Sequence, residues 1–116
     1  MRYMLMIHND PELHPIPGSP GWDALMAEYV QFTEELATHG TAYSGDPLTG
    51  PDTATTVRVR GGETLVVDGP FAETKEWMSG YFLLDLDSLD QALAVAAMIP
   101  SAKFGSVEIR PVAQMM

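Results

Sequence analysis

Cysteine is absent from the 116 residues of this chain. The chain therefore has no disulfide bond, no zinc–thiolate site and no thiol nucleophile. This absence fits a protein that works in a reducing compartment.

Positive charge is also scarce. Six Lys and Arg residues stand against sixteen Asp and Glu residues, which gives a formal net charge of -10. A field of that sign repels phosphate backbones and anionic lipids, so we expect neither a nucleic acid nor a membrane as a direct partner. The simplest role of such a charge is solubility, because net charge bears on association rather than on fold.

Long apolar runs are missing as well. The N-terminal apolar run ends at Ile7, where it meets His8, and it is too short for a signal peptide or a membrane span. The chain also has no phosphate-binding glycine loop, no nucleotide-binding fingerprint and no recognisable Ser–His–Asp arrangement. We therefore expect a cytoplasmic protein that works without a cofactor.

Apolar residues, by contrast, are plentiful. They make up 46% of the chain against 19% charged residues, which is typical of a globular protein. A chain of this length forms one domain and buries on folding roughly two-thirds of the surface that the extended chain exposes. The sequence therefore predicts a single domain over residues 1–116 with a genuine apolar core.

The apolar spacing predicts two helices. From Trp22 onward, apolar residues recur at the three-and-four spacing of one helical face, and Gly40 is placed as the C′ residue of this helix. Ser88 and Gln91 form a capping-box pattern, which starts a second helix that Pro100 closes.

Short apolar or alternating segments bounded by turn residues predict the strands. They span residues 3–8, 41–44, 55–60, 63–67, 78–86 and 107–110. The order of strands and helices predicts an α+β fold, namely a ferredoxin-like antiparallel sheet with two helices on one face plus an inserted β-hairpin.

The hairpin has the strongest turn signal in the chain. Gly61 and Gly62 lie between its strands, and a type I′ turn needs positive φ at both central residues. In that register Val57 faces Val66 on an apolar face. Asp68 follows in phase with Val66, so its carboxylate is expected to point with the apolar side chains.

The strands over residues 3–8 and 78–86 are apolar on both faces. Two helices cover one face of such a sheet, and an uncovered apolar face of that size would be an aggregation liability. We therefore expect a second copy of the chain to cover it, giving a homodimer whose sheets face each other.

The stretch DGPFAETKE, residues 68–76, is the leading candidate for chemistry. An Asp that opens a turn commonly accepts a hydrogen bond from the N–H two residues on, but Pro70 has none. One interpretation is that Asp68 fixes the turn through another backbone N–H, while Lys75 belongs to a solvated charge cluster. The other is that Asp68 acts as general acid or base at the edge of an apolar cleft, with Lys75 as its electrostatic partner.

Further residues are candidates for a ligand or metal site. We predict substrate contacts from His8, Tyr29, Tyr43 and Phe71, although aromatic residues at helical spacing more often belong to a core. A second cluster has atoms suited to a divalent metal: His8, Asp10, Glu12 and His14. Its spacing matches no ligand motif, so we predict no metal.

The nonapeptide that begins at Asp68 resembles the YCII-related proteins of the DGPF subgroup. Other parts of the chain resemble the same family, namely residues 2–7, 32–36, 54–58, 80–82 and 105–111. The resemblance covers nearly the whole chain. It implies a dimeric α+β barrel of ferredoxin-like protomers and a small bacterial protein whose reaction is generally unassigned.

The resemblance also implies two kinds of function. One is a small-molecule enzyme, by analogy with muconolactone-type isomerases and dehalogenases of the same architecture. The other is an accessory role near extracytoplasmic-function sigma factors. In the wider family a helix-borne His with an Asp has been suggested as an active pair, but this chain has Tyr29 and Thr38 at about those places.

Two hypotheses follow. The first is a cofactor-independent enzyme that transfers protons on a small, cyclic or aromatic molecule in a cleft near Asp68. The second is a non-catalytic regulatory or ligand-sensing dimer that binds a protein such as a sigma factor.

Overall fold

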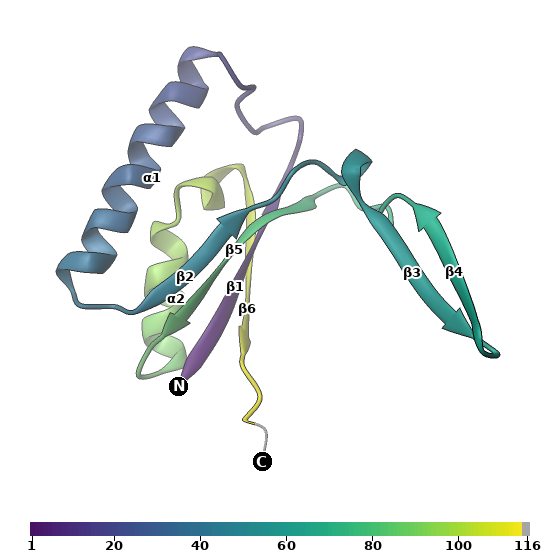
Figure 1. The fold of residues 1–116 in the computed structure, drawn as a ribbon. Coiled ribbons are helices and arrows are strands. Elements are labelled where there is room, and N and C mark those ends of the chain that lie inside the picture. Colours follow the sequence, from purple (N-terminus) through teal and green to yellow (C-terminus); the bar gives the residue numbers. More distant parts are fainter. Residues whose placement is uncertain (115–116) are drawn as a thin grey trace.

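A computed structural model describes residues 1–114 (Figure 1). Its strands are β1 (Arg2–Asn9), β2 (Tyr43–Pro47), β3 (Thr55–Arg60), β4 (Glu63–Asp68), β5 (Trp77–Asp85) and β6 (Gly105–Pro111). Its helices are α1 (Pro20–Thr38) and α2 (Leu89–Met98), with two short 3-10 helices, η1 (Pro51–Thr53) and η2 (Pro100–Phe104).

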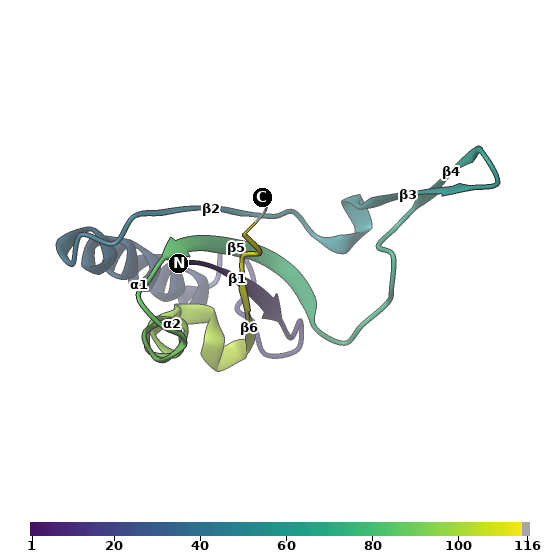
Figure 2. The ribbon, with the colours of Figure 1, turned by 90° about the horizontal axis from the view of Figure 1, so that it is seen from below.

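Four strands form an antiparallel sheet in the order β2-β5-β1-β6. With the hairpin β3-β4 set aside, this is the β-α-β-β-α-β arrangement of a ferredoxin-like fold. Both α-helices lie against one face of the sheet, as Figures 1 and 2 show. The predicted α+β fold class is confirmed, and the sheet of a single chain stays open rather than closing into a barrel.

The core lies between the sheet and the two helices. Its buried members alternate along β1 and β5 and recur along the inner faces of α1 and α2; they include Tyr3, Leu5, Ile7, Phe32, Leu36, Phe82, Leu84, Ala92 and Ala96. Phe32 and Phe82 meet edge to face with ring centroids 5.4 Å apart. These contacts hold α1 against the sheet through apolar burial.

The opposite face of the sheet carries no helix within residues 1–114, and we call it the helix-free face. Met4 and Met6 of β1 lie opposite Leu83 and Tyr81 of β5 there, and all four side chains are half-buried. The alternation predicted for β1 is therefore confirmed, because Tyr3, Leu5 and Ile7 point to the core while Met4 and Met6 point away from it.

Local signals set the helix ends. Ser19 caps α1 by accepting a hydrogen bond from the Trp22 N–H at 3.2 Å, so the helix begins two residues before the apolar spacing does. Gly40 follows its end with φ of 70, which fits the predicted C′ position. Ser88 caps α2 by accepting from the Gln91 N–H at 3.2 Å, as the capping-box pattern predicts.

β3 and β4 form a separate two-stranded sheet. Gly61 and Gly62 have φ of 58 and 80, as a type I′ turn requires, and Val57 pairs with Val66 as predicted. The hairpin stands away from the body in both views (Figures 1 and 2). It contributes to a Cα radius of gyration of 16.2 Å, above the about 13 Å expected of a compact chain of this length.

Several element boundaries differ from the sequence prediction, most of them by one or two residues. β2 begins at Tyr43 and continues to Pro47, whereas the sequence predicts a strand over residues 41–44 followed by a loop. Pro47 is tolerated because β2 is an edge strand, where a missing N–H need not break the ladder. β6 begins at Gly105, where a Cβ would lie 2.0 Å from the His8 carbonyl oxygen. The end of α2 agrees with the prediction, because the helix ends at Met98 and Pro100 begins η2.

Candidate functional site

A cavity of about 740 Å³ lies between α1 and the part of the sheet formed by β2 and β5. This volume falls within the range of roughly 300–1,000 Å³ that is typical of small-molecule sites. Its aromatic lining comes from α1, β2 and β5 and consists of Trp22, Tyr29, Tyr43, Trp77, Tyr81 and Phe82. The residues that precede α1 and those that follow β2 complete the wall.

Glycines in the sheet make room for this cavity. Three successive positions on the inner face of β5 are Leu84, Phe82 and Gly80. Leu84 is buried in the core, Phe82 lies at the cavity wall, and Gly80 has no side chain to fill the space. Gly45 of β2 pairs with Phe82 and Pro47 pairs with Gly80. The inner face of the sheet therefore loses side-chain volume toward one end, and the space that α1 spans is left open there.

Tyr29 supplies a fixed polar group at the cavity wall. Its hydroxyl donates a hydrogen bond to Ser101 Oγ at 2.7 Å, and Ser101 is 2% exposed. Burial raises the pKa of the Tyr29 phenol, which outweighs the opposing effect of the bond to Ser101. The phenol is therefore neutral near pH 7 and can act as a hydrogen-bond donor or a general acid.

His14 and Asn9 add two more polar groups to the lining. His14 Nδ1 lies 3.1 Å from the Pro15 carbonyl oxygen, and its ring meets Trp22 edge to face at 6.1 Å. When Nδ1 carries the proton and donates to that carbonyl, Nε2 is left as an acceptor. The Asn9 Oδ1 atom is buried and has no hydrogen-bond partner among residues 1–114.

A hydrogen-bonded pair joins β2 to β5 beside the cavity. The Tyr81 hydroxyl donates to Asp46 Oδ2 at 3.1 Å, and both residues belong to the lining. This bond, together with the negative charge of Asp46, raises the pKa of Tyr81. Because Tyr81 points to the helix-free face, this carboxylate and phenol lie on the opposite side of the sheet from α1.

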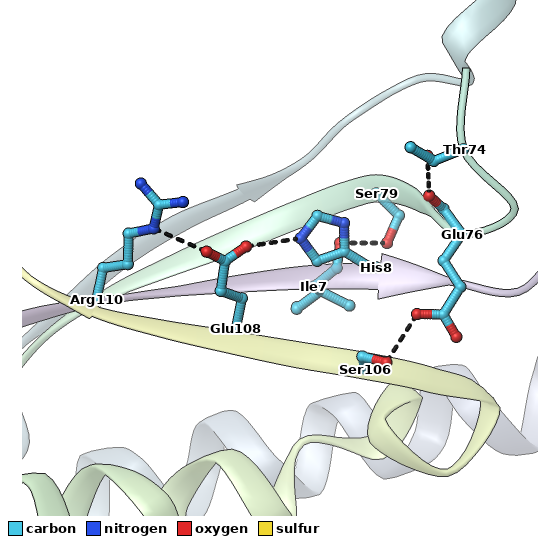
Figure 3. Close-up of polar contacts among 8 residues, drawn as sticks. All are labelled: Ile7, His8, Thr74, Glu76, Ser79, Ser106, Glu108 and Arg110. Carbon is cyan, nitrogen blue, oxygen red and sulfur yellow. Dashed lines mark hydrogen bonds and ion pairs between the residues drawn. The ribbon is translucent and has the colours of Figure 1, made fainter. Parts of the chain in front are cut away.

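Two of the predicted substrate-binding residues, Tyr29 and Tyr43, lie in this cavity. The structure places His8 on the helix-free face, where its Nε2 lies 3.5 Å from Glu108 Oε1 (Figure 3). That separation is longer than that of a usual N–H···O hydrogen bond. Arg110 Nε donates to Glu108 Oε2 at 2.7 Å, and this bond is the main cause that lowers the pKa of Glu108.

The remaining predicted site residues lie outside the lining of this cavity. Asp68 ends β4 in the predicted register with Val66, but the whole strand is exposed, so one chain forms no apolar cleft around its carboxylate. Phe71 is 82% exposed. Lys75 Nζ lies 3.5 Å from Asp10 Oδ2, so its ion pair is with Asp10 rather than with Asp68.

The end of the nonapeptide is tied to the main sheet. Ser106 of β6 donates a hydrogen bond to Glu76 Oε1 at 2.7 Å, and the Thr74 hydroxyl donates to the Glu76 carbonyl oxygen (Figure 3). Ser79 Oγ donates a hydrogen bond to the Ile7 carbonyl oxygen at 3.4 Å. Residues 74–76 are thereby anchored where β5 begins.

The second sequence cluster does not assemble. Asp10 is buried and accepts a hydrogen bond from the Glu12 N–H at 3.0 Å, which fixes the turn after β1. His14 turns toward Trp22 and Phe104. In the part of the chain that the structure describes, no group of three or more His, Cys, Asp or Glu side chains is arranged to hold a metal ion.

Several lining residues were not identified by sequence reasoning, namely Asn9, Asp46, Trp77, Tyr81 and Ser101. Trp77 directly follows the nonapeptide, so its position in the sequence could have identified it as a candidate site residue. Ser101 had no such signal in the sequence, because it contacts Tyr29 from 72 positions away in the chain.

Neither α-helix within residues 1–114 has the length and apolarity needed to cross a bilayer.

Comparison with known proteins assigns the family. The YCII-related domain matches residues 1–116. An uncharacterized protein of Rhizobium meliloti (strain 1021) is 34% identical over 115 residues, which cover 97% of this chain and 93% of that protein. The chain therefore belongs to the YCII-related family.

Proposed function

We propose that this protein is a homodimer that binds a small, largely apolar or aromatic organic molecule in the cavity between α1 and β2. The single observation that supports this most is the cavity itself, with its volume of about 740 Å³ and its aromatic walls. Such walls favour a planar ligand, and a few polar groups at fixed positions are what orient ligands in sites of this kind.

The proposed chemistry is proton transfer without a cofactor. Tyr29 is the candidate acid, because its hydroxyl lies at the cavity wall and carries a proton at neutral pH. His14 is the candidate base, because hydrogen bonding of Nδ1 to the Pro15 carbonyl leaves Nε2 as an acceptor. A substrate would suit this arrangement if it presented an acidic proton to His14 Nε2 and the atom that gains negative charge to the Tyr29 hydroxyl.

Asp68 and Lys75 could contact the ligand only if a second chain brought them to the cavity. Neither residue lines the cavity of its own chain, and Lys75 pairs with Asp10. The acid–base role proposed for Asp68 therefore requires the hairpin of a partner chain to bring the carboxylate to the ligand. Such a role makes the homodimer part of the function.

The homodimer is supported by the helix-free face. Met4, Met6, Tyr81 and Leu83 are half-buried there and remain uncovered by either helix. An apolar sheet face that stays open to water is costly, and a second copy offers a face of the same character.

The cavity is tested with the fluorescent probe 8-anilinonaphthalene-1-sulfonate. Met26 lines the cavity and is partly exposed, so Met26→Trp should fill space without disturbing the core. We expect this variant to bind the probe about tenfold more weakly than the wild type, because the added ring occupies the site. Fluorescence titration reports the affinity.

The matched control is Met98→Trp. This substitution adds the same ring at an exposed position of α2 that lies outside the cavity. It should leave probe affinity unchanged. Equal binding to the wild type and Met26→Trp would refute the cavity as the site. A stoichiometric protein partner that copurifies in moderate salt, with no probe binding at the cavity, would instead favour the regulatory hypothesis.

A further inference from the structure

The hairpin arm, residues 55–68, exposes apolar side chains that its own chain does not cover. Val57, Val59 and Val66 share one face of the arm and are 58%, 60% and 62% exposed. Six such side chains lie on or next to the arm, counting Leu65, Val67 and Phe71. Both faces of the arm therefore expose apolar side chains, and exposed apolar surface of this kind marks interaction sites.

An isolated two-stranded hairpin is marginally stable in water, because it has no third layer on which to bury an apolar face. This arm pairs with no other strand of residues 1–114. Its ordered type I′ turn and regular pairing are therefore best stabilised by a surface outside its own chain.

The position of the arm indicates what that surface is. In Figure 2 the helices lie on one side of the main sheet, while the arm extends beyond the sheet and rises on the other side. A body seated on the helix-free face would therefore lie next to the arm. The helix-free face and the hairpin arm therefore border the same region of space.

Charge permits a contact between the arm and a second copy. The charged residues of the arm are Arg58, Arg60, Glu63 and Asp68, which cancel, so the formal net charge of -10 lies on the rest of the chain. Two acidic bodies repel each other, whereas a neutral arm with an apolar face approaches such a body without that penalty. The arm is thus the segment best suited to contact another copy.

We propose that the Val57, Val59 and Val66 face of each arm packs against a second copy of the chain that covers the helix-free face. Two-fold symmetry makes the contact reciprocal, so each copy holds the other with its arm. The inference rests on the proposed homodimer and adds the segment that secures it. It also places Asp68, which shares that face of the arm, at the boundary between the copies.

The test compares two neighbouring substitutions on the same strand. Val66→Asp puts a charge on the proposed contact face, and Val67→Asp puts the same charge on the opposite face of the arm. Both positions are exposed in the single chain, at 62% and 54%, so both variants should fold. Circular dichroism and the unfolding midpoint check this.

We expect Val66→Asp to raise the dimer dissociation constant by at least about tenfold, and Val67→Asp to change it by less than about threefold. Sedimentation velocity over a dilution series measures both constants. Hydrogen exchange should also show that protection of the amides of residues 55–68 increases with protein concentration.

Each alternative outcome has a distinct meaning. A wild-type dimer that tolerates Val66→Asp, or that responds equally to both substitutions, overturns the arm contact and leaves the homodimer standing. A wild-type monomer at micromolar concentration overturns both the arm contact and the homodimer. Binding of the fluorescent probe in the cavity is measured separately and is affected by neither result.

Discussion

Tyr29 connects the cavity wall to the packed interior. Its hydroxyl donates to Ser101 Oγ, which is buried, so water cannot easily replace the bond when it is lost. Burial raises the pKa of the phenol above 10.0, the value of an exposed tyrosine. The folded chain therefore holds this proton at pH values where the unfolded chain has released it.

Tyr29→Phe should lower the free energy of unfolding by about 1 kcal/mol at neutral pH, because the Ser101 hydroxyl loses its partner. A raised folded-state pKa contributes stability that is complete below the unfolded value and is lost as pH rises through the folded value. The decline in stability between about pH 9 and about pH 11 should therefore be smaller in Tyr29→Phe than in the wild type. Urea unfolding across this range measures both effects.

Tyr43→Phe is the control for this comparison. The Tyr43 side chain is 42% exposed, so removal of its hydroxyl should cost less than about 0.5 kcal/mol. Tyr81, whose pKa is also raised, is present in all three proteins and cancels from the comparison. An alkaline decline as steep in Tyr29→Phe as in the wild type would contradict the assignment to Tyr29.

β2 is the element on which the cavity most depends. It is an edge strand that lies close to β5, and Gly45 sits where the two strands approach. A Cβ at Gly45 would lie 2.3 Å from the Tyr81 carbonyl oxygen and 3.0 Å from Phe82 Cδ1. The carbonyl belongs to the backbone, so β2 itself would have to move.

Gly45→Ala should therefore destabilise the fold by about 1–3 kcal/mol, as overpacking against a rigid neighbour does. Ser44→Ala, one position earlier on the exposed side of the same strand, should change the free energy of unfolding by less than about 0.5 kcal/mol. Urea denaturation gives both values. A fully stable Gly45→Ala would mean that β2 does not approach β5 this closely.

The molecule as a whole is acidic and extended. Its formal net charge is -10, and the hairpin arm adds none of it. Two such bodies brought together by apolar faces must overcome mutual repulsion. Salt screens this repulsion, because the Debye length falls from about 30 Å at 0.01 M to about 8 Å at 0.15 M.

The proposed dimer should therefore tighten as salt rises from about 20 mM to about 300 mM at neutral pH. Analytical ultracentrifugation in sodium chloride and in potassium chloride separates screening from a specific ion effect. The salt effect should shrink near the sequence pI of about 4.4. A dimer that weakens steadily with salt at neutral pH would indicate that ion pairs hold it together instead.

Features that depend on neighbouring residues could be predicted from the amino-acid sequence. The Gly61-Gly62 turn, the Ser88 cap and the apolar face of α1 are set within a few positions, since turn geometry and helical spacing are local. The order of these elements was then sufficient for the ferredoxin-like topology, and the alternation along β1 identified its two apolar faces.

The location of the candidate site could not be predicted in this way, because it depends on contacts between distant parts of the chain. Period-two alternation says that Asp68 and Val66 share a face, but not whether that face meets a core or solvent. Lys75 reaches Asp10, and Tyr29 reaches Ser101, across long separations in the chain. Such contacts depend on how α1, β2 and the hairpin are placed in space, and local propensity carries no information on that placement.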